Sequence, residues 1–87
     1  MDLGVLAAIR LLPRHKKEVE ELASTSEEFR GLCRDLADAE TVLDRLEKSE
    51  APDRAARRIE YRSLLDGLEA ELRQAVQEKH VTEYRQS

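Results

Sequence analysis

Apolar residues recur at alternating steps of three and four along two stretches of the chain, and a proline lies between the stretches. The first stretch is Phe29, Leu32, Leu36, Ala39, Leu43 and Leu46, and the second is Tyr61, Leu65, Leu68, Leu72 and Ala75. This spacing places each set on one side of an α-helix, as in the a and d positions of a coiled coil. The break at residues 50–53 is short, so the second helix must run back antiparallel to the first. The pattern therefore predicts a long helical hairpin.

The ends of these two helices carry recognisable capping residues. Ser26 is a good N-cap for the first helix, while Thr25 with Glu28 has the spacing of a capping box, so both starts stay open. Pro52 stops the first helix, and Asp53 can cap the second. We therefore expect a first long helix at 25–49, a turn at 50–53, a second long helix at 54–81 and a frayed tail at 82–87.

A helical segment over residues 1–24 precedes the hairpin. The apolar residues between positions 3 and 9 are spaced for one helix face, and Asp2 can cap that helix. Pro13 disfavours a helical residue before it, yet it also fits the first turn of a new helix, so the segment is one kinked helix or two short ones. We predict an all-α fold in a single domain over 1–87, a coiled-coil-like antiparallel hairpin with one or two short N-terminal helices.

The composition restricts the class of protein. Charged residues make up 39% of the chain and aromatic residues 3%, which is typical of long amphipathic helices and excludes collagen-like and low-complexity chains. The apolar run at residues 3–12 is shorter than the stretch of about twenty residues that spans a membrane. Asp2 stands where a signal peptide carries basic residues, and the single cysteine allows no disulfide within the chain. We therefore expect a cytoplasmic protein with no membrane partner.

The seam of a two-helix hairpin is narrow, and the chain has more apolar residues than the seam uses. Because small domains are marginally stable, we expect the N-terminal helices to cover part of the surplus and the rest to form an interface between two copies, in a homodimer with a four-helix arrangement. The predicted interface residues are Leu3, Leu6, Ile9, Val19 and Leu22, with Ile59 and Val76 as extensions. The function that this pattern favours is protein–protein interaction or self-assembly.

A row of arginines at the start of the second helix indicates an alternative function. The row is Arg54, Arg57, Arg58 and Arg62, and a second basic cluster lies at residues 14–17. Unopposed basic side chains of this kind bind nucleic-acid phosphates. The chain has a formal net charge of −4, however, and the first long helix is its acidic part, so ion pairs between the two helices are favoured over a nucleic-acid partner.

No catalytic, cofactor or metal site is recognisable from spacing. The three glycines lie too far apart for a phosphate-binding loop. His15 and His80 lie near opposite ends of the chain, and Gln77 stands where a Glu-x-x-His motif needs glutamate, so we expect no metal site. Cys33 lies next to the seam and is expected to be a small buried hydrophobe. We therefore expect no enzymatic activity, no cofactor and no small-molecule substrate.

Two glycines occupy the same heptad position on the two long helices. Gly31 and Gly67 both precede a seam residue and fall outside the hairpin interface. Glycine inside a helix costs about 1 kcal/mol relative to alanine, so the pair indicates either a close approach by another backbone or neutral drift.

The start of the first long helix, Ser26-Glu27-Glu28-Phe29-Arg30-Gly31-Leu32, resembles that of the small bacterial YdcH-like proteins. Those proteins are short helical hairpins with a Ser-x-x-Phe-x-x-Leu start and a Lys/Arg-rich start to the second helix. The resemblance covers about residues 16–80, and the chain departs from it at residues 3–12 and in using arginine where the family uses lysine. It implies a hairpin fold without enzymatic activity.

Overall fold

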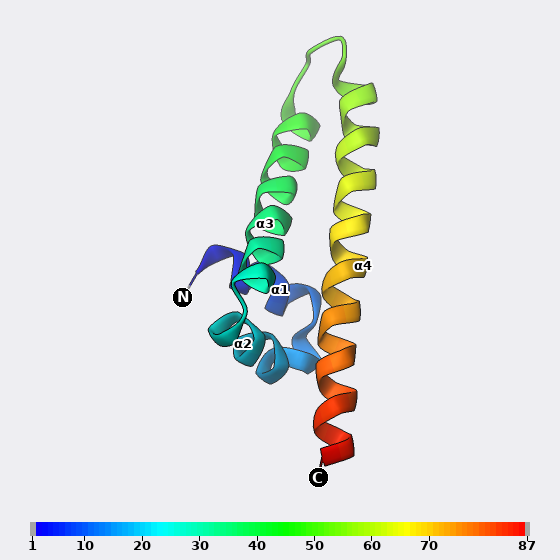
Figure 1. Ribbon diagram of the computed structural model, residues 1–87. Coiled ribbons are helices and arrows are strands. Elements are labelled where there is room, and N and C mark those ends of the chain that lie inside the picture. Colours follow the sequence, from blue (N-terminus) through cyan, green and yellow to red (C-terminus); the bar gives the residue numbers. More distant parts are fainter. Residues whose placement is uncertain (1, 87) are drawn as a thin grey trace.

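Four α-helices and one 3-10 turn make up residues 2–86, the part of the chain that the computed structural model describes. Their bounds are α1 Leu3–Leu11, η1 Pro13–His15, α2 Lys16–Thr25, α3 Glu27–Lys48 and α4 Arg54–Gln86. Helices α3 and α4 form a long antiparallel hairpin, and α1 and α2 pack against the end away from its turn (Figure 1). No strand occurs within these residues, so the predicted all-α fold is confirmed.

The predicted apolar seam holds the hairpin together. Its fully or almost fully buried members are Phe29, Leu36, Ala39, Leu43, Leu46, Leu65, Leu68 and Leu72. Leu32 and Ala75 are only partly buried, whereas the residue after each of them, Cys33 and Val76, is 0% and 1% exposed. A straight α-helix drifts from a strict heptad repeat, and α1 and α2 cover positions beside the seam. The buried stripe is therefore wider than a two-helix coiled coil needs.

The N-terminal segment consists of two helices rather than one kinked helix. Asp2 caps α1 as predicted, because its Oδ1 accepts a hydrogen bond of 2.6 Å from the Gly4 N–H. Pro13 is the first residue of η1, where a missing N–H costs nothing. The chain turns at η1, so that α2 begins at Lys16 beside the end of α4.

The start of α3 settles the choice between the two candidate caps. Ser26 is the N-cap, and its Oγ accepts a hydrogen bond of 3.1 Å from the Phe29 N–H. Thr25 is the last residue of α2, where its hydroxyl donates to the Glu21 carbonyl at 3.0 Å. Ser26 therefore separates the two helices, and its extended backbone changes the direction of the chain.

Helix α4 is longer than the sequence predicts. It begins at Arg54 as expected, but it continues through most of the predicted frayed tail and ends at Gln86. Within this last part, the Thr82 hydroxyl donates to the Glu78 carbonyl at 2.8 Å. Ser87, the last residue of that tail, lies outside the described residues.

Helices α1 and α3 approach each other closely at Gly4. A Cβ atom placed on Gly4 would lie 2.8 Å from backbone atoms of Cys33 and Arg34 on α3. The small side chains of Ala7 and Ala8 are 1% and 0% exposed, and they extend the same close approach along α1. Glycine is needed here because any side chain would push the two backbones apart.

The two glycines that the heptad pattern singled out make no such contact. A Cβ on Gly31 would meet only the Arg34 guanidinium, at 4.0 Å, and one on Gly67 would meet nothing within 4 Å. Within residues 2–86, no other backbone therefore approaches Gly31 or Gly67 closely. The close approach occurs instead at the third glycine, Gly4.

The molecule is elongated, with principal extents of 54 × 22 × 21 Å. No helix within residues 2–86 has the length and the hydropathy that crossing a membrane requires. Helix α1 is the apolar one, but its nine residues are far fewer than the about twenty that a span needs.

We predict that Gly4→Ala destabilises the fold by about 1–3 kcal/mol, the usual cost of overpacking a core. The added methyl group would meet backbone atoms of α3, which cannot rotate away as a side chain can. Urea unfolding followed by circular dichroism measures the change in the free energy of unfolding.

Gly67→Ala is the matched control, because the added methyl group meets nothing within 4 Å. Alanine has the higher helix propensity, so this variant should be stabilised by up to about 1 kcal/mol. Equal effects of the two substitutions would contradict a close contact at Gly4.

Candidate functional site

The N-terminal helices cover only one end of the hairpin. Helix α1 packs on α3, and α2 contacts both α3 and α4 near the end away from the turn (Figure 1). Nearer the turn, α3 and α4 have no third helix beside them, and Ile59 and Leu64 on α4 are 72% and 51% exposed. Exposed large apolar side chains that lie beside a groove are candidates for an interface.

A groove with a volume of about 740 Å³ lies between α3 and α4 near the turn, and we call it the tip groove. Its lining residues are Leu43, Glu47, Ala55, Arg58, Ile59, Arg62, Ser63 and Asp66. Ala55 and Ile59 lie off the heptad register that begins at Tyr61, so the first turns of α4 carry apolar residues outside the seam. The shift of register therefore leaves an apolar surface beside the hairpin contact.

The tip groove carries charges of both signs. The Arg58 guanidinium lies 3.9 Å from the Glu47 carboxylate, and the Arg62 guanidinium lies 3.7 Å from that of Asp66. All four side chains are about half exposed or more, so each pair contributes little to stability, about 0–1 kcal/mol. These arginines can therefore exchange their present partners for others at small cost.

The arginine row predicted as a possible nucleic-acid contact is thus largely engaged within the chain. In addition to Arg58 and Arg62, Arg54 donates a hydrogen bond of 2.7 Å to the Ser49 carbonyl across the turn. Arg57 is exposed. The second basic cluster, residues 14–17, lies apart from the row, where η1 meets α2.

A second hollow, of about 280 Å³, lies elsewhere along the hairpin. It is lined by Leu64 together with Val42, Tyr61 and neighbouring residues, and it shares no residue with the tip groove. Ile59 and Leu64 are therefore exposed on different sides of α4.

Two of the predicted interface residues lie inside the protomer. Val19 on α2 and Val76 on α4 are 0% and 1% exposed, so they belong to the core and present no surface to a partner. The correction has a physical reason: the docking of α2 on the hairpin covers them. Ile9 and Leu22 are partly buried and pack against the same core.

The other predicted interface residues are exposed in two separate places. Leu3 and Leu6 on α1 are 77% and 39% exposed, and they border a hollow of about 310 Å³ with Ala37 and Thr41 of α3. Ile59 lies in the tip groove, on the part of the hairpin that α1 does not reach. The predicted interface is therefore not one continuous surface.

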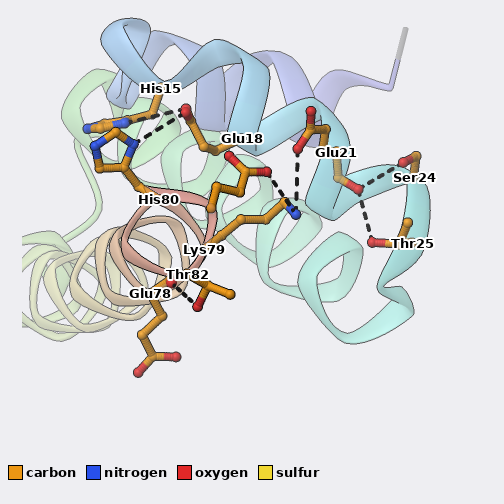
Figure 2. Close-up of polar contacts among 10 residues, drawn as sticks. His15, Glu18, Glu21, Ser24, Thr25, Glu78, Lys79, His80 and Thr82 are labelled. Carbon is orange, nitrogen blue, oxygen red and sulfur yellow. Dashed lines mark hydrogen bonds and ion pairs between the residues drawn. The ribbon is translucent and has the colours of Figure 1, made fainter. Parts of the chain in front are cut away.

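The structure brings together two histidines that are distant in the sequence. The rings of His15 and His80 lie 5.5 Å apart between centroids and are inclined at 68°. Both rings point their Nδ1 atoms at the Glu18 carboxylate, at 3.5 and 3.6 Å (Figure 2). We call these three residues the histidine cluster. Spacing alone missed it, since His15 and Glu18 form an ordinary i,i+3 pair and His80 comes from another helix.

A second set of charges beside the histidine cluster attaches the end of α4 to α2. Lys79 Nζ lies 3.2 Å from the Glu83 carboxylate and 3.5 Å from that of Glu21 (Figure 2). The pKa of Lys79 is raised, mainly by its hydrogen bond with Glu83. These contacts give a physical reason why α4 stays helical beyond residue 81.

Cys33 is the small buried hydrophobe that the sequence predicts. It is 0% exposed under α1, and burial, with a smaller contribution from the charge of Asp2, raises the pKa of its thiol to about 11. A thiol with so high a pKa carries almost no thiolate at neutral pH, so it is a poor nucleophile and a poor metal ligand.

Comparison of the chain with protein-family models, with curated proteins and with solved structures finds no match. The resemblance to YdcH-like hairpins therefore stays a prediction, and the site has to be interpreted from its own geometry.

We predict that the Cys33 thiol of the native protein reacts with Ellman's reagent at least about 100-fold more slowly than that of the urea-unfolded chain. Burial blocks access, and the raised pKa leaves little thiolate at neutral pH. Rapid stoichiometric labelling of the native protein would contradict this packing. Gly4→Ala, which pushes α1 away from α3, should speed the reaction.

Proposed function

We propose that this chain is a small non-catalytic interaction protein that assembles as a homodimer through the tip groove. The observation that carries the proposal is Ile59, an isoleucine 72% exposed on a groove between two packed helices. Burying such a side chain contributes about 1.5–3 kcal/mol. The N-terminal helices cannot supply this burial, because they cover the other end of the hairpin.

The charges around the tip groove favour a second copy of the chain as the occupant. A two-fold axis sets one surface against itself, so every group must find a partner among the same groups on the other copy. The tip groove is suited to this, since it holds two arginines, Arg58 and Arg62, and two carboxylates, Glu47 and Asp66. An all-basic or all-acidic groove would repel its copy. Here each arginine can meet a carboxylate of the other copy.

The size of the surface favours a reversible dimer. Across a two-fold axis, the large exposed apolar side chain and its smaller neighbours are buried twice. This burial has to offset the lost freedom of two molecules, about 4–15 kcal/mol. We therefore expect a dimer that dissociates on dilution rather than an obligate one.

We predict that Ile59→Glu converts the dimer to a monomer of 10.0 kDa. A carboxylate in the centre of an apolar contact would be buried without a partner. Light scattering behind size exclusion, at two protein concentrations, measures the mass of each species. The wild type should approach twice the chain mass at the higher concentration.

Leu64→Glu is the matched control, because Leu64 is also an exposed apolar residue of α4 but lies outside the tip groove. It should leave the dimer intact. A second control, Leu3→Glu with Leu6→Glu, tests the exposed side of α1. If either control breaks the assembly and Ile59→Glu does not, the interface lies elsewhere. A wild type that is monomeric at both concentrations would overturn the proposal.

The nucleic-acid alternative makes a different prediction. Binding through Arg54, Arg57, Arg58 and Arg62 would retard a generic RNA or DNA oligonucleotide, and the retardation would fall steeply with salt. If Ile59→Glu still retards the oligonucleotide and the double variant Arg57→Ala, Arg58→Ala does not, nucleic-acid binding would replace dimerisation as the proposed function. We expect no retardation at low salt, because the chain has a formal net charge of −4 and the carboxylates of Glu47 and Asp66 among these arginines repel phosphate.

A further inference from the structure

We propose that His15, Glu18 and His80 form a binding site for one divalent transition-metal ion of the zinc class. The site lies at the end of the hairpin away from the tip groove, and it is independent of the proposed dimer. It would join α2 and the residue that precedes it to α4.

The three side chains are already placed to share one ion. Each offers one ligand atom, and these atoms lie within 4.8 Å of one another. Zinc bound tetrahedrally to imidazole nitrogen and carboxylate oxygen at about 2.0–2.1 Å holds its ligand atoms about 3.3 Å apart. Nδ1 of His15 lies 3.5 Å from Oε2 of Glu18, and Nδ1 of His80 lies 3.6 Å from Oε1, so each imidazole is close to that separation from one carboxylate oxygen. His80 is about half exposed, so its side chain can rotate to close the remaining gap.

One oxygen of the Glu18 carboxylate is buried and lacks a hydrogen-bond partner among the described residues. This oxygen is Oε2, and the Glu18 side chain as a whole is 12% exposed. The contact of 3.5 Å to His15 is longer than an N–H···O hydrogen bond, which spans about 2.7–3.2 Å. Buried carboxylates are normally paired or bound to metal, because an unpaired charge is costly to bury. A cation between Glu18 and the two imidazoles would satisfy it.

The neighbouring lysine does not supply that cation. Lys79 precedes His80 on α4, but its ammonium group pairs with Glu21 and Glu83 and not with Glu18 (Figure 2). In the first set of contacts, Lys79 supplies the positive charge between Glu21 and Glu83. The adjacent histidine cluster has no lysine or arginine among its three residues.

The donor set selects the class of metal. Two imidazole nitrogens and one carboxylate suit zinc, cobalt, nickel and copper, whereas magnesium and calcium prefer oxygen ligands alone. Three protein ligands leave a fourth tetrahedral position open to water or another ligand. We therefore expect Zn²⁺ and Co²⁺ to bind, and Mg²⁺ to leave the site empty.

Zinc titration of the full chain by calorimetry, at about neutral pH after removal of metal with a chelator, tests the site. We expect one ion per chain, and a rise in Tm of about 10 °C when free zinc is 100-fold above Kd. Co²⁺ should give the intense visible absorption of a four-coordinate ion. The absence of saturable binding would overturn the proposal.

Three variants assign the ligands: His15→Ala, His80→Ala and Glu18→Gln should each weaken zinc binding at least about 10-fold. Glu78→Gln is the matched control, since Glu78 is an exposed carboxylate on α4 that contacts Gln74 and lies outside the cluster. It should bind zinc as the wild type does. Circular dichroism and the Tm measured in chelator show whether each variant is folded. If Glu18→Gln unfolds, His80→Ala still tests the site, because His80 is about half exposed.

Two further outcomes separate this site from its alternatives. Unchanged affinity in all three ligand variants would place the ion elsewhere and overturn the proposal. One ion per two chains, with a doubled mass that depends on zinc, would mean that the histidines bridge copies, which would also overturn it. Ile59→Glu should bind zinc as the wild type does, so failure of the dimer and failure of the metal site are distinguishable.

Discussion

The contact between the backbones of α1 and α3 at Gly4 determines the arrangement of most of the molecule. Because Gly4 has no side chain, α1 can lie directly on residues 33 and 34 at this point. That position directs the chain through η1, so that α2 reaches across to α4. This close approach places α1 over the Cys33 thiol. It also brings α2 to the end of α4, where the histidine cluster forms.

The same contact explains why the two ends of the molecule differ. Helices α1 and α2 are each less than half as long as α3, so they cover only the end on which they dock. That end has a wide core and polar contacts between α2 and α4. The other end has two helices, a narrow seam and an exposed isoleucine, Ile59. The contacts among three or more helices therefore lie at the first end, and the exposed isoleucine lies at the second.

The local features of the fold could be predicted from the sequence, because they depend on neighbouring residues. Steps of three and four identify the long helices, and Asp2 and Ser26 are recognisable caps. The packing of the N-terminal helices could not be predicted in this way. Nothing in the periodicity distinguishes Gly4, which contacts a backbone, from Gly67, which faces open space. Periodicity likewise does not show that Val19 and Val76 are buried, because their burial depends on how the helices pack in the tertiary structure.

The histidine cluster also cannot be predicted from local spacing. His15 and His80 are separated by most of the chain, and each alone resembles a histidine at a helix end. Only the antiparallel return of α4, combined with the turn at Pro13, places them on one carboxylate. The tip groove could be predicted in part. The shift of register near residue 60 is visible in the sequence, but the exposure of Ile59 is known only from the packed structure.

Helix α4 has a mechanical consequence because it is one uninterrupted element of 33 residues. At 1.5 Å per residue it is a rod of about 50 Å, and one end carries His80 while the other carries the tip groove. On this helix Ile59 and His80 lie about 30 Å apart. The buried leucine seam holds α3 along the same rod. The hairpin is therefore a spacer, which keeps an ion at one end clear of a second copy at the other.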